Sequence, residues 1–115
     1  MTFASGAMAG SGYLAVPDGP GPAVIVIQEW WGLVGHICDV VDRFAAAGFV
    51  AYAPDLYHGV ATTEPDTASK LMMELELDRA GREIVNAAAW LLTRDDVSSA
   101  SVGTVGFCMG GALAI

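Results

Sequence analysis

The chain has 115 residues, of which 54% are hydrophobic, and it carries a formal net charge of -8 at pH 7. This length predicts at most one domain. The net negative charge and the few Lys and Arg residues argue against partners that are held by basic patches, namely nucleic acid and anionic membranes. No apolar run reaches the roughly 20 residues of a membrane-spanning helix, so we expect a protein that neither enters nor binds a membrane.

The amino terminus and the cysteines indicate a compartment. Residues 1–6 contain no basic residue ahead of an apolar segment, so they do not resemble a secretory signal, and we expect a cytoplasmic protein. Cys38 and Cys108 are too few for a disulfide framework. A reducing compartment would keep both as thiols.

The first predicted elements are strands. Residues 12–17 alternate apolar and small side chains, and the Gly- and Pro-rich residues 18–22 predict a turn, so a β-hairpin arm is expected here. Residues 23–27 form a continuous, mostly β-branched run. This pattern is typical of a strand buried on both faces of a parallel sheet.

A helix and a second buried strand follow. Apolar residues recur at helical spacing from Ile37 to Phe44, and Gly48 stands where a helix carboxyl terminus favours a left-handed residue. Residues 49–53 then predict a strand that ends at Pro54. The three elements together make a βαβ unit.

Residues 66–93 again have helical spacing, interrupted in the charged stretch 74–83, which contains Gly81. We expect two helices or a kink there. The core-facing side is predicted from Leu71, Met72, Leu75, Ile84, Ala88, Leu91 and Leu92. A succession of strands and helices predicts an α/β fold with a doubly wound, mostly parallel sheet.

The last segment carries the clearest chemical signal. A β-like run enters Gly106-Phe-Cys108-Met-Gly110-Gly111, and a helix-like run leaves it. This is the pattern of a nucleophile elbow with a thiol in place of the serine hydroxyl. A helix amino terminus lowers the pKa of a thiol from about 8.5 and so favours the reactive thiolate. The glycine spacing does not fit a dinucleotide or phosphate loop, and we expect neither a cofactor nor a metal.

Four segments together resemble one family. Residues 28–33 (Gln-Glu-Trp-Trp-Gly-Leu), 36–37 (His-Ile), 53–59 (Ala-Pro-Asp-Leu-Tyr-His-Gly) and 106–111 are similar to the amino-terminal half of dienelactone hydrolase family proteins. The resemblance spans nearly the whole chain. It implies that residues 1–115 are a single partial domain with an α/β-hydrolase fold, truncated just after the nucleophile elbow.

The resemblance also implies site residues. Cys108 matches the family's nucleophile, which attacks an ester or lactone carbonyl to give a thioester, and Glu29 matches the glutamate that helps to activate it. The backbone N–H groups of Trp30 and Met109 would contact substrate as the oxyanion-hole donors. Each residue has a simpler alternative: a buried small thiol for Cys108, a solvated or capping acid for Glu29, and core packing for Trp30 and Trp31.

The remaining polar candidates are less well placed. The family's catalytic Asp and His follow the nucleophile in chain order, so neither His36 nor His58 matches that histidine. His36 is expected to be structural, and Asp55 is expected to be a turn or capping acid. Without the downstream Asp and His, the 115 residues alone are expected to have weak or no activity.

The substrate class is broad. Cys38 stands where family members often carry a basic residue, and residues 60–69 contain no arginine for a substrate carboxylate. The motifs therefore imply a small carboxylic ester or lactone rather than dienelactone itself. In the family the elbow strand is central in the sheet, so we expect a chain of this extent to expose an apolar sheet edge and to self-associate through it, or to pair there with a separate carboxyl-terminal polypeptide.

Two other functions compete with a cysteine hydrolase. The first is a non-catalytic binding module that retains the elbow. The second is a thiol-based redox protein that uses Cys108 with Cys38, although the sequence has no Cys-x-x-Cys motif. Ligand binding without hydrolysis would favour the first, and a disulfide formed under mild oxidant would favour the second.

Overall fold

The computed structural model describes residues 7–9, 12–28, 32–33, 35–57, 63–74 and 77–106. Within them the elements, in chain order, are β1 (Ala7–Ala9), β2 (Gly12–Ala15), β3 (Gly21–Ile27), α1 (Gly35–Ala46), β4 (Val50–Pro54), α2 (Pro65–Glu74), α3 (Leu77–Leu92) and β5 (Val97–Gly106). None of the helices in these ranges is long and apolar enough to cross a membrane.

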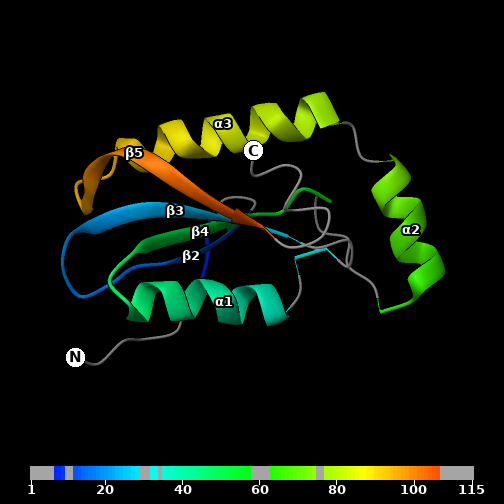
Figure 1. The fold of residues 1–115 in the computed structure, drawn as a ribbon, viewed down its shortest axis with the longest axis horizontal. Coiled ribbons are helices and arrows are strands. Elements are labelled where there is room, and N and C mark those ends of the chain that lie inside the picture. Colours follow the sequence, from blue (N-terminus) through cyan, green and yellow to red (C-terminus); the bar gives the residue numbers. More distant parts are fainter. Residues whose placement is uncertain are drawn as a thin grey trace.

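The strands form one sheet in the order β1-β2-β4-β3-β5. β3 pairs in parallel with both β4 and β5, whereas β1 and β2 run antiparallel to their neighbours. Helix α1 covers one face of the sheet and α3 covers the opposite face (Figure 1). The prediction of a doubly wound α/β fold is confirmed.

The hairpin predicted around the turn at residues 18–22 is wrong, because β2 pairs with other strands. β2 does not pair with β3 across the turn at residues 18–20, because β4 lies between these two strands. Instead β2 pairs with β4, from Gly12 opposite Pro54 to Ala15 opposite Ala51, and forms its hairpin with β1. Gly21 and Pro22, which were predicted to belong to the turn, are the first residues of β3.

Helix α1 follows its predicted pattern closely. Ile37, Val41 and Ala45 are fully buried at a spacing of four residues, so one side of the helix packs against the sheet. Gly48 has a φ of 103°, as its predicted role requires. The Phe49 N–H donates to the Phe44 carbonyl over 3.0 Å, and the Gly48 N–H donates to the Ala45 carbonyl over 3.0 Å.

These two hydrogen bonds define a Schellman motif, which satisfies carbonyl groups that the helix end would leave without partners. Its usual apolar contact is present, because the rings of Phe44 and Phe49 meet edge to face with centroids 5.7 Å apart. The end of α1, and hence the start of β4, is therefore closely fixed.

The predicted break within residues 74–83 is confirmed, because this region contains two helices rather than one. α2 ends at Glu74 and α3 begins at Leu77, and Gly81 lies inside α3. Ile84 and Leu91 are buried as expected, whereas Leu92 is 42% exposed. Leu92 is in the last turn of α3, adjacent to buried Leu91 but about 100° around the helix, so it points away from the sheet.

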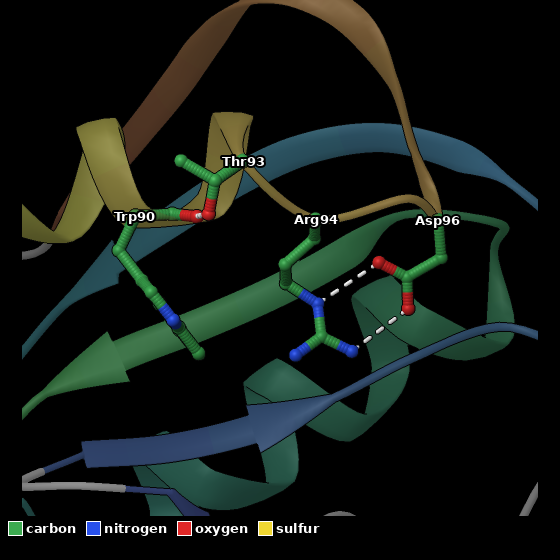
Figure 2. A network of polar contacts seen from close by, with 4 residues as sticks. All are labelled: Trp90, Thr93, Arg94 and Asp96. Atoms are coloured by element: carbon green, nitrogen blue, oxygen red, sulfur yellow. Dashed lines mark hydrogen bonds and ion pairs between the residues drawn. The ribbon is translucent and has the colours of Figure 1, made fainter.

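A polar turn joins α3 to β5 (Figure 2). The Arg94 guanidinium donates to both carboxylate oxygens of Asp96 over 2.9 Å, and it lies 5.5 Å from the centroid of the Trp90 ring. The Thr93 hydroxyl donates to the Trp90 carbonyl over 2.6 Å. The Asp96 carbonyl accepts the Gly21 N–H over 3.0 Å, so this turn aligns the starts of β5 and β3.

The register between β3 and β5 then shifts once. Gly21 is opposite Val97, but Ala23 is opposite Val102, so β5 contains extra residues in this interval. The Ser99 hydroxyl fills the irregularity: it accepts the Ala23 N–H over 3.1 Å and donates to the Ser101 carbonyl over 2.7 Å. Beyond this point the pairing is regular up to Ile27 and Gly106.

Candidate active site

The three parallel strands end at one edge of the sheet, where β3, β4 and β5 all point to the right in Figure 1. β3 ends at Ile27 and β5 at Gly106, and these two residues are direct partners in the parallel ladder. Open α/β sheets bind their ligands at this carboxyl edge. The segments that carry the predicted chemistry leave the sheet here.

The four predicted site residues, Glu29, Trp30, Cys108 and Met109, lie outside the described residues. What the structure places is the sheet position from which each segment departs. Glu29 is two residues beyond Ile27, and Cys108 is two residues beyond Gly106. The segments that carry Glu29 and Cys108 therefore leave the same edge of the sheet from adjacent strands. Each of the two residues follows the end of its strand by two positions.

On the other side of β3, the ladder to β4 stops earlier. The last register pair is Ile25 with Tyr52, although β3 continues to Ile27 and β4 to Pro54. A side chain spans this opening: Gln28 Oε1 accepts the Leu56 N–H over 2.8 Å. Gln28 and Leu56 are both fully buried, and Gln28 is the only buried polar residue in the described ranges.

The loop after β4 also brings ionisable groups to this edge. Asp55 directly follows β4 and precedes the turn at Leu56 and Tyr57. Burial raises the pKa of the Tyr57 hydroxyl, and burial together with the negative charge of Asp55 raises the pKa of the Tyr52 hydroxyl. Both phenols are therefore neutral at physiological pH. Tyr57 in this loop and Tyr52 within β4 therefore present O–H groups rather than phenolates.

The segment between β3 and α1 is partly described. Gly32 is buried with a φ of 97°, a conformation that side chains rarely adopt, which accounts for glycine at this place in the motif of residues 28–33. Leu33 packs against the core that α1 covers. His36 is exposed in the first turn of α1, and His58 lies outside the described residues.

Cys38 is half-buried in α1, the helix on which the sequence analysis placed it. Burial raises the pKa of its thiol, and the Asp42 carboxylate raises it further. Cys38 is therefore a protonated, weakly nucleophilic thiol at neutral pH. This environment is the opposite of the one that the elbow pattern predicts for Cys108.

Gln28 belongs to the motif of residues 28–33, but its role was not predicted from the sequence. The available signal was a polar residue at the end of a continuous buried strand, since a glutamine there must find hydrogen-bond partners. Its partner, the Leu56 N–H, is 28 residues away in the sequence and depends on how β3 and β4 separate.

The order of the strands and the helices on both faces of the sheet are those of an α/β-hydrolase fold, and solved structures agree. A dienelactone hydrolase-like promiscuous phosphotriesterase from metagenomic libraries matches with a TM-score of 0.75 and 30% identity, over 90% of this chain and 45% of that one. A provisionally identified dienelactone hydrolase from Klebsiella pneumoniae matches with a TM-score of 0.74 and 32% identity, over 87% of this chain and 45% of that one.

The model of the dienelactone hydrolase family matches residues 11–115, and the chain belongs to this family. Protein usf from Aquifex pyrophilus is 42% identical over 110 residues, which is 90% of this chain and 48% of that protein. A protein of Aquifex aeolicus with the provisional name carboxymethylenebutenolidase is 41% identical over 90% of this chain and 48% of its own length. The chain thus spans about half the length of these curated relatives.

Proposed function

We propose that residues 1–115 are a partial α/β-hydrolase domain that contributes the nucleophile of a carboxylic ester or lactone hydrolase. Cys108 is the nucleophile and Glu29 its activating carboxylate. The observation that carries this proposal is the parallel pairing of Ile27 with Gly106. It sends both segments from neighbouring strands to the edge where α/β sheets bind ligands.

The proposed reaction is acyl transfer to sulfur. Glu29 accepts the Cys108 proton, and the thiolate attacks the carbonyl carbon of the substrate. The backbone N–H groups of Trp30 and Met109 stabilise the oxyanion of the tetrahedral intermediate. The C–O bond to the leaving group then breaks, the proton passes to the departing alkoxide, and the acyl group remains on Cys108 as a thioester.

Release of the acyl group needs an activated water, which is a histidine's task in triad enzymes. The two histidines among the 115 residues, His36 and His58, both precede Cys108, unlike the family's catalytic histidine. We therefore expect the 115-residue polypeptide to acylate once, slowly, without steady-state turnover.

The test is intact-mass analysis after incubation with p-nitrophenyl acetate at pH 7. We expect a gain of one acetyl group in the parent and in Cys38→Ala, and none in Cys108→Ala. Cys38→Ala is the matched control because it removes the other thiol, whose pKa is raised by burial. Repeated turnover that Cys108→Ala abolishes would contradict the expected single acylation, and the absence of any Cys108 adduct would contradict the proposed nucleophile.

The proposal includes a small-molecule ester or lactone as substrate, and self-association as a property of the sheet edge. Among the described strands β5 pairs with β3 alone, so its other edge presents main-chain groups to a second copy. The expected apolar character of this edge is wrong. The exposed residues of β5 are small or polar, namely Ser98, Ala100, Ser101, Gly103 and Thr104.

A further inference from the structure

We propose that Gln28 is a positioning residue of the hydrolase site: its side-chain amide holds the loop at Asp55–Tyr57 against the end of β3 and so sets the geometry of that site. This inference rests on the function proposed above. It assigns to Gln28 no contact with the reacting atoms.

Gln28 spans a gap between β3 and β4. The β3–β4 register ends at Ile25 and Tyr52, and both strands run on beyond this pair. Gln28 Oε1 accepts the Leu56 N–H over 2.8 Å, three residues past the end of the register on β3 and four past it on β4. A side-chain hydrogen bond thus replaces main-chain pairing where the two strands separate.

Both partners of this hydrogen bond are buried. Gln28 and Leu56 are both fully excluded from solvent, so water cannot replace either partner. A buried backbone N–H left without an acceptor is costly, and such groups are almost always paired in native proteins. A glutamine at the end of an otherwise apolar strand therefore has a specific task, which an apolar residue of the same size would not perform.

The other end of the Gln28 amide is its Nε2 donor. Gln28 Nε2 is buried and has no hydrogen-bond acceptor among the described residues. Buried side-chain amides rarely leave a donor unused. This N–H group is therefore available at the edge from which Glu29, the next residue in the chain, departs. One side chain thus joins the β4 loop to the start of the segment that carries the proposed activating carboxylate.

The experiment compares three variants of the 115-residue chain. Gln28→Met keeps the size of the side chain and removes both its acceptor, which binds the Leu56 N–H, and its N–H donor. Gln28→Glu keeps the acceptor, and it keeps a donor while the buried carboxyl group is protonated, which burial favours by raising its pKa. Tyr13→Phe is the control, because it removes the hydrogen bonds that the Tyr13 hydroxyl donates to the Asp42 carboxylate on α1, and because Tyr13 lies on β2, which is not a neighbour of β3.

The first measurement is hydrogen exchange of the Leu56 amide relative to amides of the β3–β4 ladder. In Gln28→Met we expect Leu56 to exchange at least about tenfold faster relative to the ladder, because its buried acceptor is lost. In Tyr13→Phe the exchange rates of the Leu56 amide and of the ladder amides should change together. Leu56 exchange that follows the ladder in Gln28→Met would overturn the proposal.

The second measurement is the rate of Cys108 acylation by p-nitrophenyl acetate from pH 6 to pH 8, divided by the parent rate at each pH. We expect a loss of about tenfold in Gln28→Met at every pH, the equivalent of one lost hydrogen bond. Gln28→Glu should approach the parent at pH 6 and fall below it at higher pH, because its carboxyl group loses the donor and gains a buried charge when it ionises. Such a rescue is not expected from a merely structural loss.

An equal loss of acylation in Tyr13→Phe would overturn the positioning role, because any destabilisation would then suffice. Failure of the parent to form a Cys108 adduct is a separate result. It would remove the proposed hydrolase function and with it the site that Gln28 serves, whereas Leu56 exchange would still report whether the amide bridge exists.

Discussion

Individual polar side chains complete the sheet where its main-chain pairing is interrupted. Near the start of β3, the Ser99 hydroxyl accepts the Ala23 N–H within the register shift. At the carboxyl end, Gln28 accepts the Leu56 N–H beyond the last β3–β4 pair. Both contacts satisfy backbone donors that would otherwise lose hydrogen bonds. The second of them lies at the edge that we assign to catalysis.

Replacing Asp96 with Asn should lower the melting temperature at pH 7 by about 1 to 5 °C, because it removes the charge of one partner in a partly exposed ion pair. The hydrogen bonds from Arg94 hold the pKa of the Asp96 carboxyl below its usual value. The pair therefore stabilises the fold above the unfolded carboxyl pKa of about 3.9, and this contribution is lost as the pH falls through the lower folded value.

The measurement is thermal unfolding of the parent and Asp96→Asn at pH 7 and pH 3, where the difference should narrow. Asp95→Asn makes the same charge change at an exposed neighbour and should have little effect. A difference between the parent and Asp96→Asn that stays constant between the two pH values would show that the carboxylate charge is not responsible.

Secondary structure elements formed by local patterns were predicted well. The β-branched run of β3 and the spacing of α1 identify these elements without tertiary information, and Gly48 marks the helix end. The pairing of β2 with β4 was not predictable in this way, because the paired residues are separated by 36 to 42 positions. The alignment of Ile27 with Gly106 has the same origin, since it depends on strand order and on extra residues in β5.

The Schellman motif at the end of α1 makes a prediction at this scale. Gly48→Ala should destabilise the chain by about 1 to 2 kcal/mol, because alanine disfavours a φ of 103°. The effect should be purely conformational, since an added Cβ would meet no atom within 4 Å. Urea unfolding of the parent and of Gly48→Ala measures this difference in the free energy of unfolding.

Gly35→Ala is the matched control. An added Cβ at Gly35 also meets nothing within 4 Å, but Gly35 begins α1 and has no positive φ. Its replacement should be neutral or slightly stabilising, because alanine favours a helix. Equal destabilisation by the two substitutions would contradict the role of the left-handed residue at position 48.

At the scale of the molecule, the central strand β3 and the edge strand β5 differ in burial. β3 lies between two parallel neighbours and is buried almost throughout, whereas β5 is one of the two edge strands among those described, with β1 at the opposite edge, and it is exposed at half of its positions. The family match covers residues 11–115, and the curated relatives are about twice as long. Whether the exposed edge of β5 pairs with a second copy is therefore the property of the whole fold that most needs measurement.

Self-association through this edge should be reversible and stronger at higher salt, because each copy carries a net charge of -8 and salt screens their repulsion. Sedimentation equilibrium over a range of chain concentrations measures it. Gly103→Lys places a charge on the exposed edge strand and should weaken association about tenfold, since lysine is a residue that natural edge strands use against pairing.

Ala46→Lys is the control, because it makes the same change in net charge at an exposed position at the end of α1. Added positive charge reduces repulsion in both variants, so a pure charge effect would strengthen association in both. Only pairing at β5 predicts opposite outcomes for the two lysines. A parent that stays monomeric at every concentration and salt would contradict the proposed self-association.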